Sequence, residues 1–295
     1  MIRKINITLA VAFVVLFALK GLKSLSTPGS AARAGGADEA SAQAGASSLA
    51  PRVYYFNWAN FAVENKLANR HGVLLGTMQA IFPKATFIHL RGDVASFAKA
   101  LREDPAAVVV GFGHHPALEG VGAVSEIPIA YSRLAVMTSR SNPWRYKGPE
   151  SRAGLRIVSN DDFLDYPFVQ RIMKAQESGN TNGIPAIKIV PDTRSREDLA
   201  RIVESGDADA FFATCDRADL MSEQISASIL QRFRMSDEFD RGGVLLRVSN
   251  VDPAFAKAVL AEYEAGMRKI DANGVRRRLF DYYGFVPESL PSVTE

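Results

Sequence analysis

The sequence predicts an α/β protein built from two similar lobes, and three observations favour this fold class. A helix–turn–strand pattern occurs at 93–111 and returns without a gap at 195–214. Apolar strands alternate with amphipathic helices from residue 52 onward, as in parallel sheets covered by helices. The part expected to be ordered, about 245 residues, is long enough for one large domain or two modest ones.

The repeated pattern keeps one register, so that Phe97 falls on Leu199 and Leu101 on Val203. In each copy the apolar residues have the i, i+3, i+4 spacing of one helix face, followed by a turn and a buried strand. They are Phe97, Ala100 and Leu101 in the first copy and Leu199, Ile202 and Val203 in the second. Either the unit recurs by chance, or the chain contains two related lobes.

The N-terminus has the features of an export signal. A basic start, MIRK, precedes 7–19, which is apolar, uncharged and shorter than the roughly 20 residues of a membrane span. Residues 1–26 are predicted to be a signal peptide or an uncleaved N-terminal anchor, and the Ala/Gly/Ser-rich stretch 27–50 a flexible linker. The body is therefore expected in the periplasm, free or tethered to the inner membrane.

Charge and cysteine content exclude some functional classes. Five of the 35 basic residues lie in 1–34, which leaves 30 basic against 32 acidic residues in the body. This balance of −2 predicts no basic patch for nucleic acid. A single cysteine, Cys215, allows no internal disulfide, and we expect it to act as a small buried hydrophobe. No motif predicts a cofactor or a bound metal.

The elements of the first half are expected in the order of a parallel sheet. Strands are predicted at 52–58 and 85–90, with a helix at 72–82 between them, and the first repeat unit then ends at Gly111. After a glycine- and proline-rich stretch, a strand is predicted at 133–139.

A second set of the same kind is expected within 140–238. It contains strands at 155–160 and 187–192, an intervening helix through Phe168 and Met173, and the second repeat unit.

The C-terminal part is predicted to be a strand followed by two helices. After the strand at 242–250, Asp252 and Pro253 are typical of a helix start, and Asn273-Gly274 of its end. A short helix follows at 275–284, where the basic trio 276–278 is expected to form a solvated face rather than a phosphate site.

In this arrangement the chain resembles the type 2 periplasmic solute-binding proteins of the amino-acid-binding kind, which serve ABC importers. Four segments carry the resemblance in the family's order: RVYYFNW…GVLLGTMQAIF, SEIPIAYSRLAVMTSR, LARIVESGDADAFFAT and FAKAVLAEYEAGMRKIDANGVRRRLFDYYG. Together they span about residues 52–286.

The resemblance implies a two-lobe periplasmic-binding-protein fold, each lobe a parallel-rich sheet flanked by helices. The strands 133–139 and 242–248 would form a two-strand hinge between the lobes. Lobe 1 would comprise 51–138 and 239–295, and lobe 2 residues 139–238. A ligand would bind where the strands end and be enclosed by hinge closure.

Candidate ligand-binding residues follow predicted strands. Asn57 and Trp58 end the first strand, where the indole could stack on a ligand or belong to the core. Near the crossover, Tyr131 and Arg133 are candidates; Arg133 could hold a carboxylate in a bidentate contact, or be a surface residue beside the hinge.

Further candidates belong to the second lobe. Asn160 and Asp161 precede a helix whose first N–H groups favour an anion, unless Asp161 is the cap itself. Thr214 and Asp216 follow the second repeat strand, where the family often places an acid that pairs with a ligand ammonium. A turn aspartate is the other interpretation of Asp216.

The sequence departs from the family's pattern at two places. The Thr-x-x-Arg that usually precedes the second segment is missing from HPALEGVGAVSE, and SNDD replaces the usual Gly-Thr. A standard α-amino acid is therefore not expected, and Asp161, Asp162 and Asp216 favour a cationic or neutral metabolite. The pair His114 and His115, with Glu119, could supply acid/base chemistry. A metal site is less favoured, because adjacent histidines in a loop point in different directions and no further ligand beyond these residues is spaced nearby.

The resemblance thus implies a monomeric binding protein that presents a small molecule to a membrane permease or receptor, with no nucleic acid as partner. Two other functions stay open. One is a periplasmic enzyme on the same fold, like the cyclohexadienyl dehydratases, with His114, His115 and Glu119 as acid/base groups. The other is a sensor or accessory domain held at the membrane by its N-terminal anchor.

Overall fold

The computed structural model describes most of the chain beyond the linker: residues 50–58, 61–62, 72–90, 94–190, 195–215, 226–285 and 290–292. The predicted signal or anchor at 1–26 lies outside the described residues, as does the linker up to residue 49. Within the described part, no helix combines the length and the apolar character that crossing a membrane requires.

The first sheet has five strands in the order β2 (Thr86–His89), β1 (Arg52–Tyr55), β3 (Ala107–Val110), β11 (Leu246–Val248) and β4 (Ala123–Val124). β1 pairs parallel with β2 and β3, whereas β11 is antiparallel to both of its neighbours. β3 is buried along its whole length because helices cover both faces, as expected of a central parallel strand.

In the described part of the chain, four helices pack on this sheet. The sheet and these helices are together called lobe 1. The helices are α2 (Val73–Ile81), α3 (Val94–Glu103), α8 (Pro253–Ala272) and α9 (Val275–Tyr282). Met78 of α2 and Tyr263 of α8 share one core with Val108, while Phe97 of α3 packs in another with Val109. Since successive β3 residues face opposite sides, α2 and α8 cover one face and α3 the other.

The second sheet has the order β10 (Asp240–Val244), β5 (Ala130–Ser139), β8 (Ala210–Thr214), β6 (Arg156–Ser159) and β7 (Ala186–Ile189), with β9 (Phe233–Met235) also paired to β5. It is flanked by α4 (Pro167–Glu177), α5 (Arg196–Glu204) and α7 (Ala227–Arg232), and the whole is called lobe 2. Three short 3-10 turns, η1 (Pro116–Leu118), η2 (Pro149–Arg152) and η3 (Asp161–Phe163), complete the described elements.

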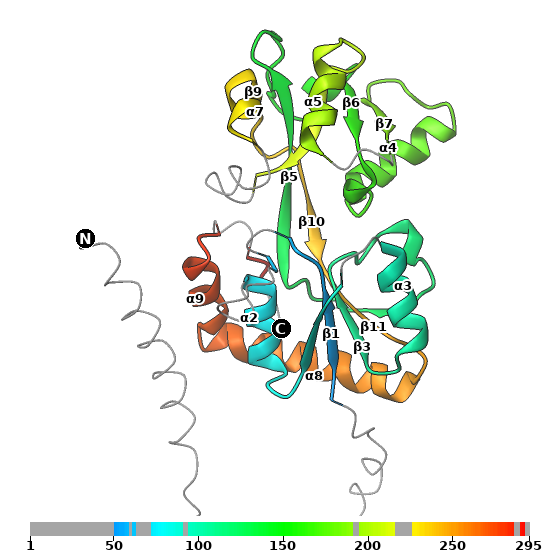
Figure 1. The fold of residues 1–295 in the computed structure, drawn as a ribbon, viewed down its shortest axis with the longest axis vertical. Helices are drawn as coiled ribbons and strands as arrows, with labels where there is room; N and C mark the ends of the chain where they lie inside the picture. Colours follow the sequence, from blue (N-terminus) through cyan, green and yellow to red (C-terminus); the bar gives the residue numbers. More distant parts are fainter. Residues whose placement is uncertain are drawn as a thin grey trace, which may run out of the picture. The chain divides into compact units, whose positions relative to one another are not determined.

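Two chain segments pass between the lobes, and Figure 1 shows β5 and β10 running from one to the other. β10 pairs antiparallel with β5 in the second sheet, and the chain enters the first sheet as β11 after a single residue, Leu245. The predicted fold class, two helix-flanked sheets joined by two crossing strands, is confirmed. By strand pairing, β5 and β10 belong to the second sheet; the lobe limits 51–138, 139–238 and 239–295 stay a prediction.

The repeated sequence unit forms equivalent parts of the two lobes. α3 and β3 in lobe 1 correspond to α5 and β8 in lobe 2, each helix leading into a buried strand. The buried helix positions differ from the expected triplet, because Ala100 and Ile202 are only half-buried. The buried sets are Phe97, Ala98 and Leu101 in α3, and Leu199, Ala200 and Val203 in α5.

The C-terminal helices confirm two sequence signals and correct a third. Asp252 caps α8 by accepting the N–H groups of Ala254 and Phe255 at 3.0 and 3.1 Å, and α8 ends before Asn273. The expectation of a solvated basic trio is wrong for Arg276, whose side chain is fully buried. It donates to main-chain carbonyls of both 128–129 and 291, which is a structural role.

Candidate functional site

A cleft of about 250 Å³ lies between the lobes and against the crossing strands. Four of its lining residues come from lobe 1, four from β5 and β10, and six from the rest of lobe 2. They are Phe56, Asn57, Trp58 and Phe112; Ser132, Gly242, Gly243 and Val244; and Asp162, Phe163, Asp165, Tyr166, Arg196 and Thr214. The cleft thus occupies the position where open α/β sheets bind ligands, beyond the carboxyl ends of their strands.

Stacked rings form the lobe 1 wall. Phe56 and Trp58 lie with centroids 5.6 Å apart at 15°, and Phe56 and Phe112 with centroids 4.7 Å apart at 28°. The main chain of Trp58 exchanges two hydrogen bonds with Ala62, at 2.7 and 2.8 Å, which fixes the segment after β1. This wall is pre-formed by packing within lobe 1.

Phe112 has an unusual backbone conformation. Its φ is 55°, and it is the one non-glycine residue with positive φ in the described part of the chain. For a bulky aromatic residue this left-handed region is unfavourable. The main chain at the next residue, Gly113, packs closely against Leu245. A Cβ on Gly113 would lie 2.5 Å from the Cβ of Leu245. The surrounding packing therefore holds the Phe112 ring against the cleft.

The lobe 2 wall carries the charges. Asp162 and Phe163 belong to η3, which follows β6, and Arg196 is the first residue of α5, whose N-cap is Ser195. The Arg196 guanidinium lies 4.8 Å from the centroid of the Phe163 ring. Burial lowers the pKa of Arg196, and the nearby carboxylate of Asp162 opposes that shift. Arginine nevertheless stays protonated, so the cleft contains a cation.

Tyr166 closes the site against the crossing strands. Its hydroxyl and that of Ser132 on β5 are 2.7 Å apart and share a hydrogen bond. A Cβ on Gly242 of β10 would lie 3.1 Å from the tyrosine ring, so glycine at this position makes room for it. The floor of the cleft is thus built by lobe 2 packing on its own hinge strands.

Hydrogen bonds connect the two lobes beside the cleft. The main-chain N–H of His114, in lobe 1, donates to Asp165 Oδ1 at 2.5 Å, and Gln170 Nε2 of α4 donates to the His114 carbonyl. Burial raises the pKa of Asp165, against the effect of the bond from His114. The lobes are therefore in contact across the cleft in this structure.

Three of the predicted ligand-binding residues line the cleft: Asn57, Trp58 and Thr214. Tyr131 and Arg133 do not, because side chains alternate along β5 and it is Ser132 between them that faces the cleft.

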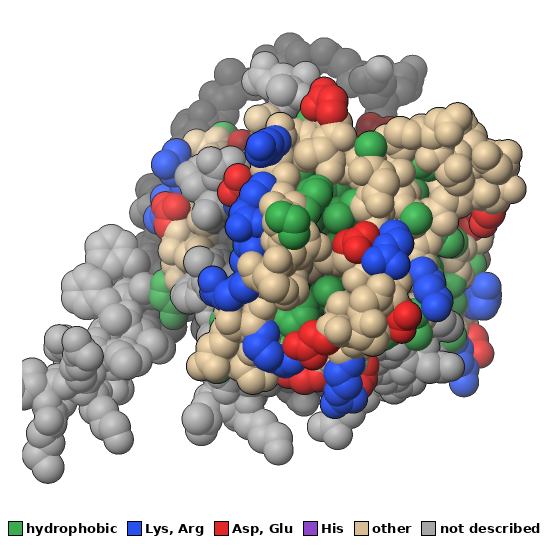
Figure 2. Space-filling model, turned by 90° about the horizontal axis from the view of Figure 1, so that it is seen from above, with side chains coloured by type: hydrophobic (Ala, Val, Ile, Leu, Met, Phe, Trp, Pro, Cys, Tyr) green, Lys and Arg blue, Asp and Glu red, His purple; other side chains and the backbone are tan. Residues whose placement is uncertain are grey.

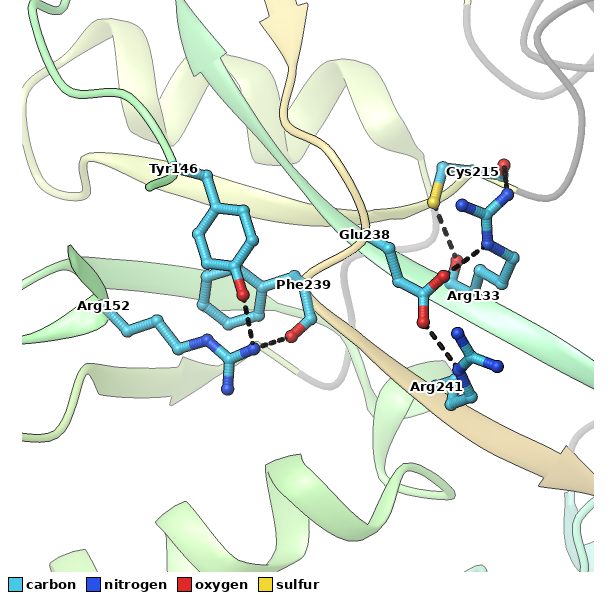
Figure 3. Close-up of polar contacts among 7 residues, drawn as sticks. All are labelled: Arg133, Tyr146, Arg152, Cys215, Glu238, Phe239 and Arg241. Atoms are coloured by element: carbon cyan, nitrogen blue, oxygen red, sulfur yellow. Dashed lines mark hydrogen bonds and ion pairs between the residues drawn. The ribbon is translucent and has the colours of Figure 1, made fainter. Parts of the chain in front are cut away.

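The expected carboxylate-binding arginine is already paired. Arg133 Nε donates to Glu238 at 2.6 Å, and Arg241 Nε donates to the other oxygen of Glu238 at 2.6 Å (Figure 3). Burial of Glu238 opposes its ionisation, but these bonds outweigh it and hold the pKa of Glu238 below its usual value. Arg241 also lies 5.7 Å from the Tyr131 ring centroid. These residues form a charge network on the strands rather than part of the cleft.

The remaining predicted residues of lobe 2 have other placements. Asn160 is buried and donates through Nδ2 to Asp162 Oδ2 at 2.7 Å, so it orients a lining residue without lining the cleft itself. Asp161 is exposed and begins η3. Asp216 lies outside the described residues.

The histidine pair takes part in loop and interlobe contacts. His115 Nδ1 accepts the N–H of Ala117 at 3.2 Å, as the N-cap of η1. Burial lowers the pKa of His115, and the charges of Asp165 and Asp161 oppose this. Neither histidine lines the cleft, and Glu119 is exposed. Among the described residues, no group of three His, Cys, Asp or Glu side chains could hold a metal ion.

Sequence reasoning missed the site's most informative residue, Arg196. A signal was present, because Ser195 caps a helix that follows the strand predicted at 187–192, and the first residue of such a helix lies at the cleft edge. The rings of Phe56 and Phe112 were missed as well. Both flank strand ends, but an aromatic residue there is equally typical of a core.

Comparisons with known proteins identify the fold. No protein-family profile and no curated protein matches the sequence. A probable amino-acid ABC transporter extracellular-binding protein from Bacillus subtilis matches with a TM-score of 0.56 and 12% identity, over 79% of this chain and 97% of that one.

Two further structures give the same picture. One, from work on glutathione import via GshT and the cystine ABC importer TcyBC of Streptococcus mutans, has a TM-score of 0.57 and 13% identity, over 82% of this chain and 98% of its own. The other, an ancestral amino-acid-binding protein described as a precursor of cyclohexadienyl dehydratase, has a TM-score of 0.52 and 12% identity, over 79% and 95%. The chain has the two-lobe fold of these proteins.

Proposed function

We propose that the protein is an exported solute-binding protein that captures a small metabolite between its lobes and presents it to the permease of an ABC importer. The observation that carries this is the cleft itself, whose walls come from both lobes and whose floor is the pair of crossing strands. Such a site is complete only when the lobes are together, so ligand binding and lobe closure favour each other.

The structure supports a simple closing movement. β5 and β10 are the main-chain connections between the lobes in the described part, so rotation about them opens the cleft. The His114–Asp165 hydrogen bond forms only when the lobes meet. A ligand that contacts both walls adds to this contact and shifts the population toward the closed form, which is the shape a permease would recognise.

The outer face of lobe 2 is open to such a partner. In Figure 2 it shows basic and acidic side chains interspersed around apolar ones. Lobe 2 also has surface ion pairs, among them Arg156–Asp209 and Arg201–Asp198, both at 2.7 Å. A mixed surface of this kind suits a protein partner better than a polyanion such as nucleic acid. The proposal therefore includes no nucleic-acid partner, and it takes the protein to be a monomer.

A thermal-shift screen of amino acids, amines, organic acids and sugars tests the proposal. A ligand at 100 times its Kd adds about 2.7 kcal/mol to the free energy of unfolding, which corresponds to roughly 5–10 °C in Tm for a chain of this size. Small-angle scattering on the same mixtures should show a smaller radius of gyration. If no compound changes either quantity, the proposed function is wrong.

An enzyme on the same fold is the second candidate, because one structural neighbour is described as a dehydratase precursor. The placement of His114 and His115 in loop contacts, away from the lining residues, favours binding over catalysis. The double exchange His114→Ala and His115→Ala distinguishes the two: loss of turnover with unchanged ligand affinity would favour the enzyme.

A membrane-held sensor differs from a free binding protein only at its N-terminus. N-terminal sequencing of the exported protein separates these two, since an intact Met1 would favour the anchor and a start near residue 27 a cleaved signal.

A further inference from the structure

The two walls of the cleft differ in chemical character. Lobe 1 contributes the stacked rings of Phe56, Trp58 and Phe112 and no charged side chain among its lining residues. The charged lining groups, Arg196 among them, all belong to lobe 2. A ligand that contacts both walls must therefore have an apolar body on one side and a polar, charged end on the other.

Arg196 determines the sign of that charged end. Its guanidinium lies over the face of the Phe163 ring and near the carboxylate of Asp162. No described residue accepts a hydrogen bond from it. Arg196 is half-buried, so water reaches part of its guanidinium. A guanidinium has five N–H donors, and a ligand that displaces this water without supplying acceptors would bind at a cost. An anionic group on a ligand would supply the missing acceptors.

The other enclosed arginines of the crossing region already have acceptors. Arg133 pairs with Glu238 at 2.6 Å. Arg247 donates to three main-chain carbonyls at 2.6 to 2.9 Å, and Arg276 donates to carbonyls at 2.8 to 3.4 Å. Arg196 differs from these three arginines in two ways. It has no such acceptor among the described residues, and it lines the cleft.

Building on the proposed function, we propose that the ligand is a small carboxylate with a compact apolar body, that Arg196 of lobe 2 receives the carboxylate, and that the rings of Phe56, Trp58 and Phe112 in lobe 1 receive the body. A guanidinium matches a carboxylate through two parallel hydrogen bonds. The cleft of about 250 Å³ lies below the roughly 300–1,000 Å³ typical of pockets for drug-sized ligands, so the body is small.

The backbone of Phe112 supports a functional role for the ring wall. A non-glycine residue held at positive φ is energetically unfavourable, and such residues cluster at binding sites. Phe112 has φ 55° and places its ring in the cleft, stacked on Phe56. The fold therefore holds an unfavourable conformation that presents an apolar surface to the ligand.

Matched compounds test the carboxylate requirement on the unaltered exported protein. The series is 3-phenylpropionate, phenylalanine and 2-phenylethylamine, with 4-methylpentanoate, leucine and 3-methylbutylamine as aliphatic counterparts, measured by calorimetry. The acids should bind and the two amines should not. Comparing each simple acid with its amino acid shows whether an ammonium near Asp162 adds affinity, and either result fits a carboxylate ligand.

Variants locate the receptor of the carboxylate. Arg196→Gln should weaken binding of the best acid about ten- to a hundredfold, as expected for loss of a charged hydrogen-bonding group, and Arg196→Lys should weaken it less. Arg201→Gln is the control on the same helix, because Arg201 is exposed and pairs with Asp198. Circular dichroism confirms that each variant is folded.

Three outcomes would overturn the inference. One is tighter binding of an amine, or of a sugar or other uncharged compound, than of every acid, which leaves the proposed function intact. The second is an equal affinity of Arg196→Gln and Arg201→Gln for the acid. The third is no binding by any compound of the screen, which would overturn the proposed function as well.

Discussion

The hydrogen bond from Gln170 allows a quantitative test of lobe closure. Gln170 lies on α4 in lobe 2, and its Nε2 donates to the carbonyl of His114 in lobe 1 and to that of Leu164 in its own lobe. It does not line the cleft, so it touches no ligand. Exchange to methionine keeps the side-chain length but removes the donor.

The magnitude follows from the bond that is lost between the lobes. One uncharged hydrogen bond contributes about 0.5–1.5 kcal/mol net, and each 1.4 kcal/mol is a factor of ten in an equilibrium constant. If ligand binds the closed form, Gln170→Met should therefore raise Kd roughly two- to twelvefold. The effect should lie mainly in faster dissociation, because opening precedes release.

Gln79→Met is the matched control. Gln79 lies on α2 and also donates to a main-chain carbonyl, that of Pro83 at 3.1 Å, but both groups belong to lobe 1. Calorimetry with the best ligand of the screen compares the variants. Equal Kd values for the unaltered protein, Gln170→Met and Gln79→Met would refute the idea that this bond stabilises the closed form.

Two further predictions concern stability. Arg276→Met removes the buried cation that donates to three main-chain carbonyls. It should lower the free energy of unfolding, measured by urea titration, by about 3–5 kcal/mol. Arg277 is exposed, so Arg277→Met is the control and should change this free energy by less than about 0.5 kcal/mol. Burial of Asp104 opposes its ionisation, but hydrogen bonds from Arg52 and other groups outweigh burial and lower the pKa of Asp104. The ionised carboxylate therefore stabilises the folded protein above the unfolded-state pKa of about 3.9, and this contribution is lost as the pH falls through the folded-state pKa. Asp104→Asn should therefore flatten the acid limb of a pH–Tm curve, and an unchanged limb would contradict this.

Much of the fold could be predicted because its signals are local and periodic. The helix start at Asp252 and Pro253 depends on capping that acts within three residues. The repeated unit at 93–111 and 195–214 indicated a helix followed by a buried strand in each copy, because the i, i+3, i+4 spacing marks one helix face and a short apolar run marks a buried strand. The short α7 and β9 were missed, since six and three residues carry too little periodicity to stand out.

The proposed ligand site was harder to predict because it depends on which arginine lacks an acceptor among the described residues. Arg133 and Arg196 look alike in sequence, each near the end of an element at the expected cleft. Arg133 lies within reach of Glu238, which is distant in sequence and adjacent only through pairing of β5 with β10. Pairings of this kind are set by tertiary structure. The expected cationic or neutral ligand followed from counting Asp161, Asp162 and Asp216 without Arg196.

One loop connects the crossing strand, the ring wall and the interlobe contact. Arg247 of β11 is 5% exposed and donates to the carbonyls of Gly113 at 2.6 Å, Leu118 at 2.9 Å and Val121 at 2.6 Å. These bonds fasten the loop after β3 to the strand that continues from β10. The same loop carries the Phe112 ring and the N–H that reaches lobe 2. It must therefore move with lobe 1 as one body, so closure brings the apolar wall and the interlobe bond to lobe 2 in a single movement. This is why the bond from Gln170 to the His114 carbonyl of the same loop should influence ligand affinity, although Gln170 does not line the cleft.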